Sequence, residues 1–137
     1  MWRCENVEKN ANKFCKFKSY FMENENENLI VKLSLEFALD IIAYSERLEE
    51  LKKYIIARQL LKSGTSIGAN VMEAKNAESK ADFIHKMKIA AKEAGETQYW
   101  FTLCELSPSY PKSENLSGKL ISIINIIPKI IVSSKAS

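Results

Sequence analysis

Basic side chains in two segments have the spacing of a binding surface. Arg58 and Lys62 recur one helical turn apart, as do Lys88 and Lys92, so each pair projects from one side of a predicted helix. Tyr99 falls on the same outward side as the second pair. Rows of cations beside an aromatic ring can hold phosphates and stack a base, so we predict that these four cations contact nucleic acid. A solvated lysine face is the alternative interpretation.

Carboxylates and nucleophiles offer weaker patterns for chemistry. Glu73, Glu93 and Glu96 suggest the carboxylates of a di-iron bundle. Such sites also need Glu-x-x-His pairs, and no glutamate stands three residues before the single histidine, His85. A nucleophile and base built from His85 and Cys104 would lack the strained turn or glycine loop that such sites use, and nucleotide-binding glycine motifs are absent. We predict no catalytic or metal site, no cofactor and no small-molecule substrate.

Composition favours helices and a reducing cytoplasm. The 137 residues include only four Gly and three Pro, and good helix formers dominate. Three widely spaced cysteines without a C-x-x-C pair argue against a disulfide framework or a zinc site. The longest apolar stretch, residues 120–132, is too short and too polar to span a bilayer, and residues 1–21 lack a secretory signal. We expect a soluble, cytoplasmic protein without a membrane segment.

The first 28 residues differ from the remainder of the chain. They show no sustained helical period, and residues 23–28 alternate Glu and Asn, a polar tract unsuited to a core. We interpret residues 1–28 as a mobile leader and residues 29–137 as the folded domain. Met22 stands where the organised part begins, so the residues before it are interpreted as lying upstream of the true start. A functional basic arm, with a net charge of +3 over residues 1–21, is the alternative.

Two amphipathic helices are predicted in the first half of the domain. The first begins near Ile30 and ends in a turn within residues 47–53, and its apolar arc is wider than one core face requires because it includes Leu35, Leu39 and Ile42. The second continues to about Asn76 and places Gly64 and Gly68 one turn apart on its buried stripe. Each glycine costs about 1 kcal/mol of helix propensity, which close approach of a neighbouring backbone would offset.

Two further helices follow. Ser79 with Asp82 three residues later is a variant of the capping box, so a helix should begin there and end before the proline-containing stretch 107–111. The last helix begins near Ser113, and Pro128 should kink it or end its regular part. Four amphipathic helices joined by short links predict an all-α fold, an antiparallel up-down-up-down four-helix bundle.

Charge is distributed unevenly along this domain. Residues 22–51 hold two basic and eight acidic groups, a net charge of −6, whereas residues 52–92 hold nine basic and three acidic groups, a net charge of +6. An exposed apolar arc favours association, and opposed charges can orient neighbouring subunits head to tail. We predict a homo-oligomer in which the first helix contributes to the subunit contact.

The second and third predicted helices also carry a recognisable pattern. Residues 58–100 closely resemble the four-helix bundle family encoded within intervening sequences of bacterial 23S ribosomal RNA genes. The matching residues are Ser66-Ile67, Asn70, Glu73-Ala74, Ser79, Asp82-Phe83-Ile84, Ile89-Ala90, Lys92-Glu93, Glu96-Thr97 and Tyr99-Trp100. More loosely, this family is similar to the accessory protein of diversity-generating retroelements, a barrel-like pentamer that binds nucleic acid and a reverse transcriptase.

The resemblance spans about residues 27–132. It implies homo-oligomerisation, with a pentamer as one form, and association with RNA; it implies no known reaction. Lys62 stands where the family commonly has arginine, so a bidentate phosphate contact there would become a point charge. Our leading hypothesis is therefore a non-catalytic oligomeric bundle that binds RNA or a ribonucleoprotein. The alternative is a self-assembling protein scaffold or adaptor without a nucleic-acid role.

Overall fold

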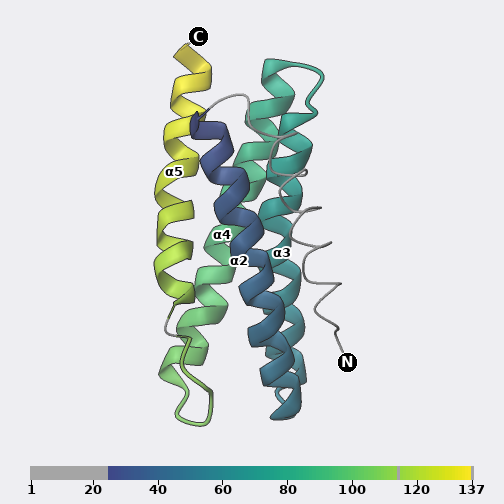
Figure 1. Cartoon of the computed structure of the whole chain (residues 1–137), viewed down its shortest axis with the longest axis vertical. Coiled ribbons are helices and arrows are strands. Elements are labelled where there is room, and N and C mark those ends of the chain that lie inside the picture. The colour runs from purple at the N-terminus through teal and green to yellow at the C-terminus, as the bar shows by residue number, and fades with distance from the viewer. Residues whose placement is uncertain (1–24, 114, 137) are drawn as a thin grey trace, which may run out of the picture.

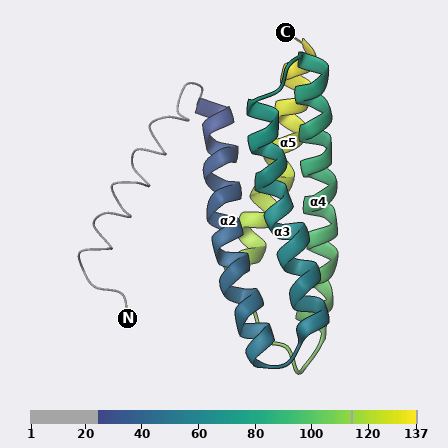
Figure 2. The ribbon, with the colours of Figure 1, turned by 90° about the vertical axis from the view of Figure 1, so that its right-hand side faces the viewer.

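The chain folds into a bundle of long helices. In this computed structural model the described residues are 25–113 and 115–136, and within them there are four α-helices and no strand. The helices are α2 (Glu25–Glu50), α3 (Tyr54–Lys75), α4 (Lys80–Leu106) and α5 (Leu116–Ala136). Each link reverses the direction of the chain, so neighbouring helices run antiparallel (Figures 1 and 2). The predicted all-α four-helix bundle is confirmed.

The helices pack in the cyclic order of the sequence. α3 packs against α2 and α4, and α5 packs against α4 and α2. Among the described residues, the backbones of the diagonal pairs, α2 with α4 and α3 with α5, do not come close to each other. Every helix contributes to one apolar core, whose largest fully buried members include Phe37, Ile41, Leu48, Leu60, Ile67, Met87, Ile123 and Ile127. Because each helix gives one side to this core, the opposite sides of all four are left for other contacts.

The first described helix begins earlier than its apolar pattern. α2 starts at Glu25, within the polar tract that we assigned to the leader. The helical backbone therefore extends beyond the apolar face of α2 at its N-terminal end. The remaining leader predictions, including those on Met22 and on a basic arm, concern residues outside the described range.

The turn between α2 and α3 lies where it was predicted and is formed without a glycine. Lys52 adopts a left-handed conformation with φ of 61°. Its N–H donates to Glu49 O at 2.9 Å, and the Lys53 N–H donates to Leu48 O at 2.8 Å. This pair of bonds is a Schellman motif, in which glycine is the usual residue at the left-handed position. Leu51, in this turn, is exposed.

The start of α4 follows the predicted capping box. Ser79 Oγ accepts a hydrogen bond from Asp82 N at 3.1 Å, which satisfies one free N–H of the first turn. Asp82 Oδ2 accepts from Glu78 N at 3.4 Å, one residue earlier than a longer glutamate would reach in the standard motif. The capping prediction is confirmed, and it fixes where the tight link between α3 and α4 ends.

The two buried-stripe glycines lie where α3 approaches α2. A Cβ at Gly64 would lie 2.9 Å from Ile41 Cγ1, closer than carbon atoms pack. A Cβ at Gly68 would lie 3.4 Å from the Ser34 carbonyl oxygen, which is tight but near ordinary contact. The predicted approach of a neighbouring backbone is confirmed at Gly68, whereas at Gly64 the Ile41 side chain fills the space and makes this the more restrictive position.

α5 begins later than predicted and includes its proline. It begins at Leu116, three residues later than Ser113, and it continues through Pro128 to Ala136, so the proline does not end the helix. By length and composition the whole of α5 is apolar enough to cross a membrane, unlike the shorter stretch 120–132 on which we based the opposite expectation. Core helices of soluble bundles pass the same test. Its inward residues Leu120, Ile123 and Ile127 are buried in the shared core.

Candidate nucleic-acid interface

Arg58 and Lys62 lie on the outward side of α3. The buried stripe of this helix runs through Ala57, Leu60, Ile67 and other residues on the same side. At about 100° per residue, Arg58 and Lys62 fall almost opposite that stripe, and both are exposed. Two cations one turn apart therefore project into solvent from α3.

Lys88 and Lys92 lie in the same way on α4. The buried residues of α4 include Met87, Ala90 and Ala94, and the two lysines fall opposite them and are exposed. Tyr99 continues this outward line toward the C-terminal end of α4, with 56% of its surface exposed. The structure thus brings together two cations and an aromatic ring along one helix.

None of these four cations has an ion pair or side-chain hydrogen bond with another described residue. Other lysines of the bundle do: Lys86 Nζ lies 2.8 Å from Glu73 Oε2, and Lys119 Nζ lies 2.5 Å from Asp40 Oδ2. These carboxylates raise the pKa of both paired lysines, chiefly through the hydrogen bond. Glu73, which we considered as a metal ligand, is therefore part of an ion pair between helices.

The four predicted contacts form two rows. α3 and α4 run side by side (Figure 2), and the Glu73–Lys86 pair sets their register. Arg58 lies 15 residues before Glu73 and Tyr99 lies 13 residues after Lys86, so the two are within about 3 Å of the same level along the helices. The rows point outward from two neighbouring helices, and half-buried residues, including Glu93, lie on the sides of the helices that face each other. An anionic chain can follow either row, but the structure does not merge them into one compact patch.

The neutral polar residues of α3 are committed to its own backbone. Thr65 Oγ1 donates to Leu61 O at 2.5 Å and Ser66 Oγ to Lys62 O at 2.6 Å. Asn70 Nδ2 donates to Ser66 O at 2.8 Å. Such bonds to the preceding turn are the common arrangement for these residue types inside helices. The cations, rather than these hydroxyl and amide groups, remain available to a partner.

The ring of Tyr99 is supported by its neighbour. Trp100 packs against Tyr99 with ring centroids 5.2 Å apart and an interplanar angle of 62°. Trp100 Nε1 donates to Glu96 Oε1 at 3.2 Å, which orients the indole. Glu96 stands four residues after Lys92, a spacing that favours an ion pair, yet its carboxylate is turned to Trp100.

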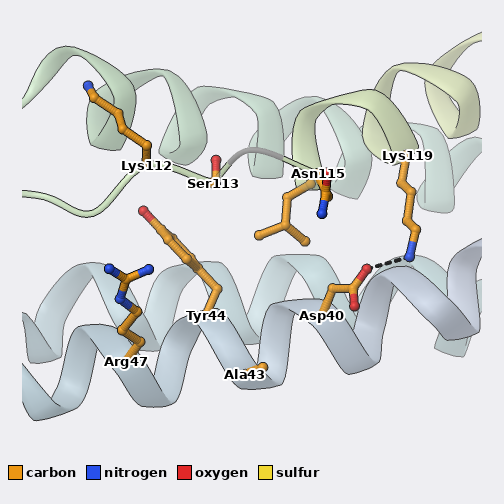
Figure 3. A pocket seen from close by; sticks show the side chains of 9 residues that line it. Asp40, Ala43, Tyr44, Arg47, Lys112, Ser113, Asn115 and Lys119 are labelled. Atoms are coloured by element: carbon orange, nitrogen blue, oxygen red, sulfur yellow. Dashed lines mark hydrogen bonds and ion pairs between the residues drawn. The ribbon is translucent and has the colours of Figure 1, made fainter.

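Sequence reasoning missed a second feature, a shallow hollow of about 590 Å³ where α5 closes on α2. Figure 3 shows Asp40, Tyr44 and Arg47 on one wall, and the link before α5 with Lys119 on the other. Asp40 and Lys119 pair across one end. These residues come from positions 40 to 119 of the chain, so no local pattern could have grouped them.

The groups around the hollow act as structural ties. Tyr44 Oη donates to Pro111 O at 2.8 Å. The pKa of Tyr44 is raised, chiefly because the side chain is buried and secondly because Cys104 lies close to it. Burial likewise raises the pKa of the Cys104 thiol, so both groups are protonated at neutral pH. Ser113 donates to Glu105 Oε1 through its N–H at 3.1 Å and its hydroxyl at 2.8 Å. These bonds hold the long link against α2 and α4.

The other combinations considered for chemistry do not form. His85 is exposed near the start of α4, whereas Cys104 is buried near its end, about 28 Å along the helix axis. Within residues 25–113 and 115–136, no three His, Cys, Asp or Glu side chains gather as metal ligands.

The comparisons with known proteins agree with this architecture. A search of curated proteins gave no match. Among solved structures, the 1.70 Å crystal structure of a protein of unknown function from the S23 ribosomal protein family of Bacteroides thetaiotaomicron is 39% identical and superposes with a TM-score of 0.73. The match covers 78% of this chain and 98% of that one.

The family comparison is direct. The family described as 23S rRNA-intervening sequence protein matches residues 26–132. This range includes α2 from its second residue, the whole of α3 and α4, and most of α5. The looser similarity to the accessory protein of diversity-generating retroelements stays a prediction. Over the greater part of its length, the chain belongs to the 23S rRNA-intervening sequence protein family.

Proposed function

We propose that this protein is a non-catalytic, cytoplasmic homo-oligomer that binds RNA or a ribonucleoprotein through the outward sides of α3 and α4. One observation carries the proposal: Arg58, Lys62, Lys88 and Lys92 are exposed in two rows, and none has a carboxylate partner among the described residues. A cation that is already paired must lose that partner to contact a phosphate. Within the part of the chain that the structure describes, these four cations do not bear this cost.

The electrostatics of the bundle agree with a polyanionic partner on this side. Residues 52–92, which comprise α3 and the first half of α4, carry a net charge of +6. Binding by such a surface would be driven by release of counterions from the phosphate chain and would be strongly dependent on salt. The family is named for an rRNA intervening sequence, which makes a structured RNA a reasonable first probe.

Titration with labelled RNA tests this proposal. The wild-type protein should bind an RNA transcript at low salt, and fluorescence anisotropy should show binding weaken steadily as salt increases. Failure to bind at low salt, or affinity that does not change with salt, would show that the basic rows are ordinary solvated surface.

A specific observation also favours self-assembly. Large apolar side chains are exposed on the outward side of α2, where Leu39 is 53% and Ile42 is 39% exposed, and on α5, where Ile121 is 51% and Val132 is 67% exposed. Helical phase places the two strips on different sides of the bundle. Two unlike surfaces can join copies head to tail, which closes a ring when the rotation allows it; the predicted pentamer is one such ring. This arrangement would serve either an RNA-binding oligomer or a protein-only scaffold.

Light scattering coupled to gel filtration tests the assembly. We expect a mass several times the 15.6 kDa chain. Leu39→Glu combined with Ile42→Glu should lower that mass while circular dichroism shows unchanged helicity, because both side chains are exposed in the single chain. A wild-type monomer at tens of micromolar protein would contradict the proposal.

A further inference from the structure

The outward side of α4 contains a glycine that packing within the chain does not explain. A Cβ at Gly95 would meet no neighbouring atom within 4 Å, so an alanine or a larger residue would fit. Glycine is the poorest helix former after proline, and Gly95 lies near the middle of α4. Gly64 and Gly68 of α3 differ from Gly95, because a Cβ at either position would lie within 4 Å of atoms of α2.

Gly95 belongs to a regular stripe. Lys88, Lys92, Gly95 and Tyr99 recur at intervals of four, three and four residues, the spacing that places side chains along one side of a helix. All four are exposed. The stripe therefore presents two cations, then bare backbone, then an aromatic ring.

Dimensions along this stripe suit an extended nucleic-acid strand. Lys88 and Lys92 are separated by about 6 Å along the helix axis, comparable to the distance between adjacent phosphates of an extended strand. Tyr99 lies about 10 Å beyond Lys92, on the far side of Gly95. Without a side chain at Gly95, a sugar–phosphate backbone can lie directly against the helix between the lysines and the ring.

The ring of Tyr99 favours a single strand over a duplex. It is 56% exposed and is supported from the side by Trp100. Bases in a duplex are paired and stacked on each other, whereas bases of a single strand are free to stack on an aromatic side chain. Nearby Glu96 is held by Trp100 Nε1, so its carboxylate is turned away from the lysines.

We infer that the Lys88–Lys92–Gly95–Tyr99 stripe is a binding site for single-stranded RNA, in which the lysines contact phosphates, Gly95 admits the strand backbone and Tyr99 stacks a base. This assignment rests on the proposed RNA-binding function and deepens it. It adds a strand preference and two residues that the basic rows alone do not identify.

Exposed glycines supply a matched pair of variants. Gly118 on α5 also has no neighbouring atom within 4 Å of a Cβ, but it lies outside the stripe. Gly95→Leu and Gly118→Leu should both fold with melting temperatures at or above that of the wild type. Gly95→Leu should weaken binding of fluorescent polyuridylate by about 5- to 150-fold, because the side chain occupies the strand's path, whereas Gly118→Leu should leave it unchanged.

The aromatic contact and the strand preference are tested with the same probe. Tyr99→Ala should weaken polyuridylate binding by about 5- to 150-fold, and Tyr99→Phe should retain it, because stacking needs the ring and not the hydroxyl. The wild-type protein should bind polyuridylate more tightly than the polyadenylate–polyuridylate duplex.

Each contrary result has a distinct meaning. If the wild type binds neither probe at low salt, both the proposed function and this site are wrong. If it binds with the expected salt dependence but Gly95→Leu and Tyr99→Ala bind equally well, or if it prefers the duplex, only the site is overturned. A change of oligomeric mass in Gly95→Leu would assign the stripe to a protein contact and would also overturn it.

Discussion

The α2–α3 contact and the outward side of α4 differ in how well the chain's own packing explains their residues. At the α2–α3 contact, Gly64 and Gly68 admit Ile41 and Ser34, so each glycine has a partner that a larger residue would displace. On α4, Gly95 faces open space and Tyr99 is largely exposed. Lys88 and Lys92 have no carboxylate partner within residues 25–113 and 115–136.

This difference separates residues that are explained by packing within the bundle from residues on its surface that packing does not explain. A buried glycine that costs helix propensity is compensated by close packing. An exposed glycine with the same cost has no such compensation within one chain. The second class of residue is the better guide to partners, because intramolecular stability does not require it.

Enlarging the glycines of the α2–α3 contact should have the largest effect on stability. Gly64→Leu should lower the free energy of unfolding by about 1 to 3 kcal/mol or more, because even a Cβ there would lie 2.9 Å from Ile41 Cγ1. Gly68→Leu should be less damaging than Gly64→Leu, since Ser34 O lies 3.4 Å from the corresponding position. Chemical denaturation with urea measures both.

Lys88→Leu is the matched control for that series, since it also introduces leucine but on the outward side of α4. Its effect on the free energy of unfolding should stay within about 0.5 kcal/mol. Equal stability of Gly68→Leu and Lys88→Leu would break the comparison, because it would mean that α3 does not present Gly68 to α2.

A smaller, pH-dependent effect should distinguish the link before α5 from the α2–α3 contact. Ser113 donates twice to the Glu105 carboxylate, and these bonds lower the pKa of Glu105. A lowered folded-state pKa stabilises the protein above the ordinary glutamate value of about 4.3, and this contribution is lost as pH falls through the folded-state pKa.

Glu105→Gln should therefore have a lower melting temperature than the wild type at neutral pH. The loss in free energy of unfolding should be less than about 1 kcal/mol, because the carboxylate is exposed and screened by solvent. The two melting temperatures should converge as pH falls below 4. Thermal scans from pH 3 to 7 measure this, and a gap that widened toward acid pH would contradict the contact.

Much of the fold followed from apolar spacing and from end signals with clear chemistry. The capping pair Ser79 and Asp82 located the start of α4, and the prolines of residues 107–111 located its end. The start of α3 was less sharply defined, because Lys52 takes the left-handed position that glycine usually marks. The start of α2 lies earlier than predicted, because apolar spacing cannot mark helical residues that precede the first apolar position.

The candidate site was only partly visible in the sequence. Helical spacing was sufficient to place Lys88, Lys92 and Tyr99 on one outward side, as the structure confirms. It could not show which cations would lack ion pairs, since that depends on the position of carboxylates on other helices, as Lys86 and Glu73 demonstrate. Nor could it distinguish Gly95 from Gly64, because only a packed neighbour separates a required glycine from an unexplained one.

The salt dependence of RNA binding tests the central claim most directly. The slope of the logarithm of affinity against the logarithm of salt concentration counts phosphate contacts, at about 0.7 per contact for a single strand. Lys88→Gln combined with Lys92→Gln should reduce this slope by about 1.4, whereas Lys129→Gln, an exposed lysine of α5, should leave it unchanged. Equal slopes for the wild type and the double variant would contradict the assignment of the α4 lysines to phosphate contacts.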